Sequence, residues 1–243
     1  QYVASQTALG FGPDCKSQVI EVYDEKGHAY IDAILVSTMH QGDLDADRKT
    51  IETMIRDNRM GFSDHVFTKY FLCTANKPKI IVNPNGEWRI GGSVSDCGVT
   101  GRKIVVNQFG GYCSVGGGNL NGKDMSKIDR SAAYMCRYLA KNIVAAGISD
   151  TAKVELSYMI GVPQPSSINI ELNRNQDLIG DIIQWIKDHV DLSPSGIIRR
   201  FDGGYPRNLH TARYGHYGKT DKEMEDKAIA RIYPWERTDI AYD

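Results

Sequence analysis

Polar and apolar residues alternate near the start of the chain in the manner of β-strands. The segment Lys16–Tyr23 alternates polar and apolar residues, Asp24–Gly27 has the composition of a turn, and Tyr30–Thr38 is again apolar and rich in β-branched residues. This order predicts a strand, a turn and a second strand.

The next stretch predicts a helix followed by two short strands. In Asp45–Arg59 apolar residues recur at helical spacing, and acidic residues near the start favour the helix dipole. Lys79–Val82 and Glu87–Ile90 are strand candidates on either side of Asn83–Gly86, which has the composition of a tight turn. We therefore expect a first unit with one helix on a sheet.

Beyond a boundary at Gly91–Gly92, the segment Lys103–Val106 predicts a short buried strand. It leads into Gly110–Gly122, a loop that contains six glycines and is called the glycine loop below. A helix is predicted next, because Ser126–Asp129 matches an N-terminal capping pattern and Gly147 suits a helix end.

Two strands and a further helix complete the predicted second unit. The strands are expected at Lys153–Ile160 and Ser167–Leu172, and the helix at Gln176–Val190. That helix is expected to bury Leu178, Ile179, Ile182, Ile183 and Ile186. Because strands and helices follow one another in a similar order twice, the sequence predicts two α+β units rather than one doubly wound sheet.

Composition narrows the classes of function. The 243 residues are 41% hydrophobic with a formal net charge of −1, so no overall field attracts polyanions and nucleic-acid binding is not expected. The five cysteines are odd in number and contain no C-x-x-C pair, which argues against a disulfide framework and a zinc site. Without an apolar run of roughly 20 residues or a signal peptide, we expect a soluble, cytoplasmic protein without a membrane partner. The chain begins at Gln1 without an initiator Met, so truncation or processing is expected.

The glycine loop approaches two phosphate-binding patterns without completing either. Gly117-x-x-x-x-Gly122-Lys123 nearly spells a P-loop, but Asp124 stands where the Mg²⁺-binding Ser or Thr belongs. The dinucleotide pattern fails as well, because Asn121 replaces its third glycine. Taken alone, such a loop is either a flexible surface loop or a cradle for phosphate groups.

Neighbouring charges favour a polyphosphate site. Lys127 lies in the first turn of the predicted helix, where a cation opposes the helix dipole unless an anion is bound. Asp129 could hold Mg²⁺ against phosphate oxygens, or it could return a hydrogen bond to the Ser126 cap. Taken singly, each Lys or Arg is more often a solvated surface charge than a ligand, and a buried salt-bridge network could explain some of them. Taken together with the loop, the charges favour a polyphosphate site; the full set is Asp96, Arg102, Lys103, Lys123, Lys127 and Asp129.

These motifs together resemble the signature of S-adenosylmethionine synthetases, also called methionine adenosyltransferases. The resemblance is carried by Asp96–Ile104 and by Gly116–Tyr134. Shorter matches extend it over nearly the whole chain: Pro13–Val19, Val36–His40, Tyr138–Ala146, Tyr214–Gly218 and Pro234–Glu236.

The resemblance implies a fold and a reaction. The family has three similar α+β domains, and this chain would hold the central domain, incomplete at its start, in residues 1–90 and the C-terminal domain in residues 91–243. The methionine sulfur attacks the ribose 5′ carbon of ATP and displaces the triphosphate, which is hydrolysed to pyrophosphate and phosphate. Such chemistry needs alignment and cations rather than a side-chain nucleophile.

The resemblance also implies roles for single residues. Asp129 would lie near Mg²⁺, Asp96 near the methionine amino group and Asp14 near the ribose. Trp88 would offer a stacking face and Ile160 would flank the adenine. The family also uses K⁺, whose site would be approached at Cys97. The triphosphate would be held by Lys16, Arg102, Lys103, Lys123 and Lys127, with loop contacts from Gly117, Gly118 and Asn119.

Three positions depart from the family pattern. Val115 replaces a usual His, Asn121 replaces a usual Ser, and Glu87-Trp88 replaces an Arg-Phe pair. The last change keeps an aromatic face but reverses a charge beside a polyanionic substrate, so nucleotide affinity or base preference is expected to differ.

The family's N-terminal domain, with its Gly-His-Pro-Asp-Lys motif, has no counterpart in this sequence. Three hypotheses follow: one chain of a split or cleaved synthetase that needs an N-terminal partner, an inactive fragment, or a non-catalytic nucleotide- or polyphosphate-binding regulatory subunit. The full set of mutually repelling cations favours the first. An incomplete first domain should expose an apolar sheet face, so we expect association with another chain in a homo- or hetero-oligomer.

Overall fold

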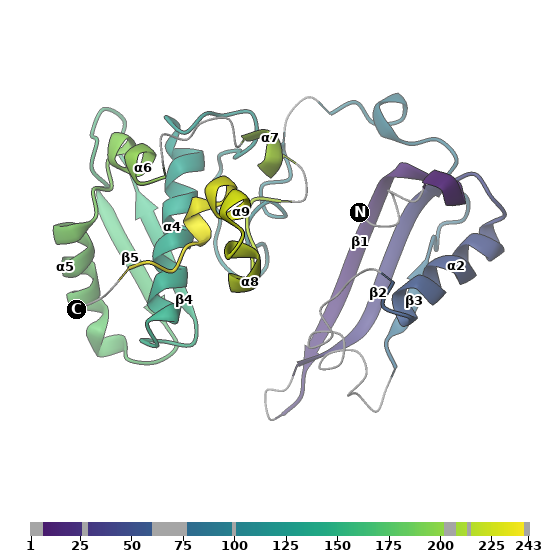
Figure 1. Cartoon of the computed structure of the whole chain (residues 1–243), viewed down its shortest axis with the longest axis horizontal. Coiled ribbons are helices and arrows are strands. Elements are labelled where there is room, and N and C mark those ends of the chain that lie inside the picture. The colour runs from purple at the N-terminus through teal and green to yellow at the C-terminus, as the bar shows by residue number, and fades with distance from the viewer. Residues whose placement is uncertain are drawn as a thin grey trace. The chain divides into compact units, whose positions relative to one another are not determined.

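The computed structural model describes residues 7–25, 29–59, 77–98, 101–201, 208–212 and 215–240. The chain divides into two compact units, residues 1–98 and 99–243, each with its own sheet and helices (Figure 1). The predicted α+β class is thereby confirmed, while the domain limits 1–90 and 91–243 stay a prediction. No helix in these described ranges is long and apolar enough to cross a membrane.

The first unit is built on a three-stranded sheet. Strand β1 (Phe11–Tyr23) runs antiparallel to β2 (Ala29–His40), and β3 (Lys79–Val82) lies parallel to β2 on its other side. The predicted strand, turn and strand are confirmed, although the turn residues Lys26–His28 lie outside the described residues. A short 3₁₀ turn, η1 (Thr7–Leu9), precedes β1.

Helix α2 (Leu44–Arg56) packs on this sheet and confirms the predicted helix. Asp43 caps it by accepting hydrogen bonds from the backbone N–H groups of its first turn. The face with Ile51, Met54 and Ile55 is buried against Ile34, Val36 and Val82, which forms the core of the first unit.

The predicted strand Glu87–Ile90 is wrong. The Asn83–Gly86 turn is present, with a hydrogen bond from the Gly86 N–H to the Asn83 carbonyl. Within the described residues, the backbone hydrogen bond that joins Glu87–Ile90 to β2 runs from the His40 N–H to the Trp88 carbonyl over 2.9 Å. One such bond does not make a strand ladder. The 3₁₀ turn η3 (Gly92–Val94) follows.

The second unit surrounds helix α4 (Ile128–Ala145), which lies against a two-stranded antiparallel sheet. Its strands are β4 (Ala152–Ser157) and β5 (Ser167–Leu172), which confirms both predicted strands. Gly147 takes a left-handed conformation with φ of +72°, as the end of α4 requires.

Helix α5 (Ile179–His189) confirms the predicted helix and follows a 3₁₀ turn, η4 (Gln176–Leu178). Ile182 and Ile186 are buried, and Ile179 and Ile183 pack at the edge of the core. Leu178 was expected in the core but is 37% exposed, because it belongs to the 3₁₀ turn rather than to the helix face. Helix α6 (Pro194–Arg200) begins at a Ser193 cap.

The predicted buried strand Lys103–Val106 is wrong as well. These residues form turns, and the backbone folds back sharply enough for the Gly110 N–H to reach the Val105 carbonyl at 3.0 Å. Val106 is 80% exposed. The β-branched segment Lys103–Val106 therefore has no strand partner, because β4 pairs with β5 alone within the described residues.

The tail adds short helices that hydrophobic periodicity did not predict. They are α7 (Asn208–Thr211), α8 (Asp221–Met224), α9 (Lys227–Ile232) and the 3₁₀ turn η6 (Pro234–Glu236). Trp235 of η6 is buried and stacks on Tyr134 of α4, with ring centroids 3.6 Å apart and planes within 7°. The tail is therefore part of the core of the second unit.

Candidate functional site

The glycine loop passes directly against the start of α4. A β-carbon on Gly118 would lie 2.1 Å from Cγ and 2.6 Å from Cβ of Asp129, so only glycine fits this close approach. Leu120 is fully buried and anchors the loop in the core. Gly122, with φ of +80°, turns the chain into Lys123.

Lys123 and Asp129 form an ion pair that joins the end of the loop to the first turn of α4. Their side chains are 30% and 44% exposed, so both remain accessible to a ligand. Asp129 also suits its place in the helix, where a negative charge favours the positive end of the dipole. The structure therefore brings three predicted site residues, Gly118, Lys123 and Asp129, into direct contact.

The predicted capping pattern at Ser126 is wrong in its details. The helix cap is Lys127, whose side chain makes no capping bond to the helix backbone. Asp124 closes the preceding turn, since its Oδ1 accepts from the Ser126 N–H over 2.8 Å and from the Ser126 hydroxyl. These hydrogen bonds from Ser126 lower the pKa of the Asp124 carboxyl. Asp129 pairs with Lys123 instead of returning to Ser126, so its capping role is excluded.

Lys127 lies beside this turn and is exposed. Its Nζ donates to the Ser126 hydroxyl over 3.0 Å, and no ion pair of Lys127 is found in the described part of the chain. Its backbone carbonyl accepts from the Ser131 N–H, as expected for the first helical turn. The cation thus stays at the helix N-terminus, where it opposes the dipole.

The exposed cations Arg102 and Lys103 follow a glycine that packs on the end of the loop. A β-carbon on Gly101 would lie 2.8 Å from Cβ of Asn121. The buried Oδ1 of Asn121 finds no hydrogen-bond partner among the described residues. Because Asn121 replaces the usual Ser of the family, an amide rather than a hydroxyl lies against Gly101.

In the first unit, Asp14 and Asp96 meet the backbone of Gly92. Asp14 Oδ2 accepts from the Gly92 N–H over 2.7 Å, and the Asp96 N–H donates to the Gly92 carbonyl over 3.0 Å. Lys16 is exposed on β1, two residues beyond Asp14. Cys97 is also exposed, and its thiol donates to the Ser93 carbonyl.

Trp88 is held from two sides in the same unit. Its Nε1 donates to the Ile90 carbonyl over 2.9 Å, and its N–H donates to Nε2 of the buried His40. The neighbouring Glu87 forms an ion pair with Arg89 at 2.8 Å, which lowers the pKa of the Glu87 carboxyl. The reversed charge at position 87 is thus balanced by Arg89, a compensation that the sequence analysis missed.

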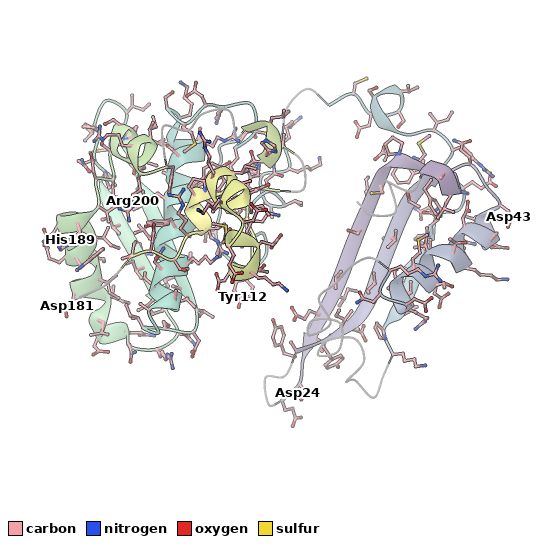
Figure 2. All side chains as sticks on the ribbon, viewed as in Figure 1. Asp24, Asp43, Tyr112, Asp181, His189 and Arg200 are labelled. Atoms are coloured by element: carbon pink, nitrogen blue, oxygen red, sulfur yellow. The ribbon has the colours of Figure 1, made fainter. Side chains whose placement is uncertain are left out.

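Ile160 lies in the loop between β4 and β5 and is fully exposed, as are large parts of Met159 and Val162. Tyr158 fixes the base of this loop, because its hydroxyl donates to the Leu192 carbonyl over 2.8 Å. The contacts of the described residues do not join Ile160 to the glycine loop. Figure 2 shows the side chains on the ribbon of each unit.

A cavity of about 970 Å³ lies in the second unit beside the glycine loop. Its lining includes Gly118 and Asp129, together with Cys113, Cys136 and Leu156. Burial raises the pKa of the Cys136 thiol to about 12, so this group is not a thiolate. Within the described residues no group of three or more His, Cys, Asp or Glu side chains could hold a metal ion together.

Sequence reasoning also missed a buried polar cluster that joins α4 to the tail. Arg130 donates to the hydroxyl of Tyr134, which in turn lies 2.7 Å from Nδ1 of His216. All three side chains are at most 2% exposed. Burial and the charge of Arg130 lower the pKa of His216 to about 4, so its imidazole is neutral at physiological pH. The signals were the family resemblances at Gly116–Tyr134, Tyr214–Gly218 and Pro234–Glu236, in which no role was assigned to Arg130, Tyr134 or His216.

A glycine-rich loop that leads into a helix, with cations beside it, is typical of anion-binding sites, and here it lies on an α+β scaffold. Residues 90–227 match the family of S-adenosylmethionine synthetase C-terminal domains. The chain therefore belongs to the S-adenosylmethionine synthetase family. This finding confirms the resemblance drawn from the motifs.

A solved structure supports the same fold over almost the whole chain. The chain is similar to a structure described as an unusual S-adenosylmethionine synthetase from Campylobacter jejuni, with a TM-score of 0.79 and 31% sequence identity. The match covers 97% of this chain and 60% of that one. The chain thus spans about three fifths of the length of this relative.

Proposed function

We propose that this chain carries the triphosphate-binding half of an S-adenosylmethionine synthetase, which forms S-adenosylmethionine from ATP and L-methionine. The observation that carries the proposal is the contact of Gly118 with Asp129 and the ion pair of Asp129 with Lys123, within a chain of this family. The relative from Campylobacter jejuni is 31% identical, which supports the reaction class.

Charge on the departing triphosphate determines what these residues do. As the methionine sulfur bonds to the ribose 5′ carbon, the bond from that carbon to the triphosphate breaks and negative charge collects on the leaving oxygens. Lys123 and Lys127 stand at the loop and the helix start to stabilise this charge, and Arg102 and Lys103 follow the glycine that packs on Asn121. Lys16 serves the same purpose from β1, and backbone N–H groups of Gly117, Gly118 and Asn119 contact phosphate oxygens.

Other residues are assigned to the two substrates by the family resemblance. Asp14 accepts hydrogen bonds from the ribose hydroxyls, and Asp96 pairs with the methionine amino group. Trp88 in the first unit and Ile160 in the second unit are each proposed as an adenine contact. The indole of Trp88 is already held by its Nε1 bond to the Ile90 carbonyl, so less side-chain entropy is lost when a ring stacks on it. The balanced Glu87–Arg89 pair limits the repulsion that a lone Glu87 would exert on a nucleotide.

Asp129 fits a role beside Mg²⁺. Protein sites for this ion commonly use one or two carboxylates, with substrate phosphates supplying further oxygens, so a three-ligand cluster is not required. The Asp129 carboxylate is accessible and is held against the Gly118 backbone. Bound Mg²⁺ would neutralise phosphate oxygens. Lys123 would then exchange its ion pair with Asp129 for the phosphates. K⁺ is proposed as a second cation, in a site that the N-terminal part completes near Cys97.

The turnover of ATP and methionine tests this function. We expect no S-adenosylmethionine from the chain alone and formation of product, with Mg²⁺ and K⁺, when the N-terminal part of a synthetase is supplied. Lys123→Ala should abolish turnover, whereas Lys187→Ala, an exposed lysine of α5, should leave it unchanged. Turnover that survives Lys123→Ala would refute the assignment.

A non-catalytic regulatory subunit that binds nucleotide or polyphosphate is the second candidate. It would need only the anion contacts of the glycine loop, and the described residues bring Gly118, Lys123 and Asp129 together there. Binding of nucleotide or polyphosphate without turnover, with every N-terminal part that is supplied, would establish this candidate. The absence of both binding and turnover would identify an inactive fragment.

We also propose that the first unit associates with another chain, as a homo- or hetero-oligomer. Val19 and Ile20 are neighbours on β1, so they point to opposite faces of the sheet, and they are 56% and 44% exposed. Ile20→Lys should shift the sedimentation velocity toward a smaller species, whereas Gln184→Lys on α5 should not. A monodisperse monomer of the unaltered chain at micromolar concentration would contradict the proposal.

A further inference from the structure

Arg130 is a buried cation at the third position of α4. It is 2% exposed, and no carboxylate forms an ion pair with it in the part of the chain that the structure describes. Its Nη1 donates to the Lys123 carbonyl over 2.7 Å, Nε to the Tyr134 hydroxyl over 3.1 Å, and Nη2 to the Thr211 hydroxyl over 2.7 Å. Each nitrogen of the guanidinium thus meets a neutral oxygen.

The contact with Lys123 reaches the end of the glycine loop. Asp129 holds the Lys123 side chain, and the next residue, Arg130, holds the Lys123 carbonyl. Both ends of this residue are therefore fixed by the first turn of α4. Because Gly122 allows a left-handed turn just before it, the backbone at Lys123 would otherwise have unusual freedom.

The far side of the guanidinium is fixed by the tail. Tyr134 is fully buried, its ring stacks on Trp235, and its hydroxyl contacts His216. Trp235 Nε1 donates to the His216 carbonyl over 2.8 Å. The Tyr134 hydroxyl accepts from Nε of Arg130 and lies 2.7 Å from Nδ1 of His216, so it joins the guanidinium to the tail. The cluster therefore sets the position of the guanidinium from within the core.

A buried charge without a counter-ion is unfavourable for folding, and hydrogen bonds to neutral oxygens offset only part of that cost. An anion at the glycine loop would recover more of it, because the charge of a buried guanidinium is screened less by water than that of an exposed one. A guanidinium needed only for packing would be served as well by an apolar side chain of similar volume.

We propose that Arg130 is a positioning residue that fixes Lys123 and supplies a buried positive charge to the anion site at the glycine loop. The inference rests on the proposed triphosphate site and adds to it a residue that does not touch the substrate. It also links the tail to the site, because Thr211 and His216 help to position Arg130 although both are distant from it in sequence.

Calorimetric titration with inorganic tripolyphosphate and Mg²⁺ tests the inference on the whole chain. Arg130→Met should raise the dissociation constant about tenfold or more, as expected when a charged hydrogen-bond donor is lost. Amide hydrogen exchange should become faster over residues 119–125 but not over α5. The lysine of Arg130→Lys keeps the charge but cannot reach three acceptors. Amide hydrogen exchange over residues 119–125 should therefore also become faster, while the affinity for tripolyphosphate should be higher than that of Arg130→Met.

Arg137→Met is the matched control. Arg137 lies on the same helix, but its guanidinium binds Glu236 of the tail at 3.1 and 2.9 Å and not the glycine loop. It should lower the melting temperature and leave the dissociation constant within about twofold. Equal loss of affinity in the Arg130→Met and Arg137→Met variants would show a general loss of folding and overturn the inference.

The remaining outcomes separate this inference from the function on which it rests. If the unaltered chain binds tripolyphosphate and both Arg130 variants bind it equally well with unchanged exchange, the inference alone is wrong. If the unaltered chain does not bind tripolyphosphate, the proposed site is wrong and the inference fails with it. Because Arg130→Lys retains the cation, it decides the matter should Arg130→Met not fold.

Discussion

At the scale of single residues, the closest approach at the candidate site is that of Gly118 to Asp129. Any side chain at position 118 must displace Asp129, including its β-carbon, from the first turn of α4. The sequence pointed to Gly118 only as one of several loop glycines. The requirement for glycine at position 118 depends on how the loop meets the helix, and residue spacing does not define that contact.

Gly118→Ala is therefore expected to destabilise the chain by about 1–3 kcal/mol, the usual cost of overpacking. Gly116→Ala is the control, because no atom lies within 4 Å of the position its β-carbon would take. Its unfolding free energy should change by less than about 0.5 kcal/mol. Urea denaturation measures both values, and equal stability of the two variants would contradict the observed packing.

His216 predicts a dependence of stability on pH. Its pKa is lowered to about 4 in the folded chain from an ordinary value of 6.5, so between these values the unfolded state binds more protons. Stability should therefore be greatest above pH 6.5 and fall as the pH is lowered toward 4, by roughly 1.4 kcal/mol per pH unit at most.

Urea denaturation at pH 7 and pH 5 measures this effect. His216→Gln should reduce the difference between the two pH values, whereas His189→Gln, which replaces an exposed histidine, should not. An unchanged difference in the His216→Gln variant would show that another group controls the stability.

At the scale of elements, hydrophobic periodicity predicted α2, α4, α5 and the strands that pair locally. It failed where pairing is decided by distant parts of the chain. Lys103–Val106 has the composition of a strand, yet β4 pairs with β5 and leaves it in exposed turns. The prediction for Glu87–Ile90 failed because this segment meets β2 at the Trp88 carbonyl and His40 N–H and forms no ladder there.

The candidate site shows the same division. Glycine spacing and adjacent charges predicted the contact region of Gly118, Lys123 and Asp129. Arg130 was missed because an arginine on an amphipathic helix is normally solvated, and its burial depends on tail residues such as Thr211 and Trp235. The short tail helices contain too few turns for a periodic pattern.

The tail should therefore contribute to the core as strongly as the predicted elements do. Trp235→Ala is expected to destabilise the chain by about 3–5 kcal/mol, because it removes a buried ring stacked on Tyr134. Trp185→Ala, in which the lost ring stacks on the exposed His189, should cost clearly less. Similar losses of unfolding free energy would mean that the tail is loosely attached.

At the scale of the whole molecule, charge is arranged locally rather than overall. The formal net charge is −1, so attraction of a triphosphate must come from the cations around the glycine loop. Family membership and the match to 60% of a solved synthetase agree with this local site. The account therefore depends on binding of a triphosphate by this chain.

The most direct test is calorimetric titration of a non-hydrolysable imidotriphosphate, with Mg²⁺, into the chain and into its Lys123→Ala and Lys187→Ala variants. We predict binding to one site, weakened about tenfold or more by Lys123→Ala and unchanged by Lys187→Ala. Absence of binding, or equal binding by all three proteins, would contradict the assignment of the glycine loop as a triphosphate site.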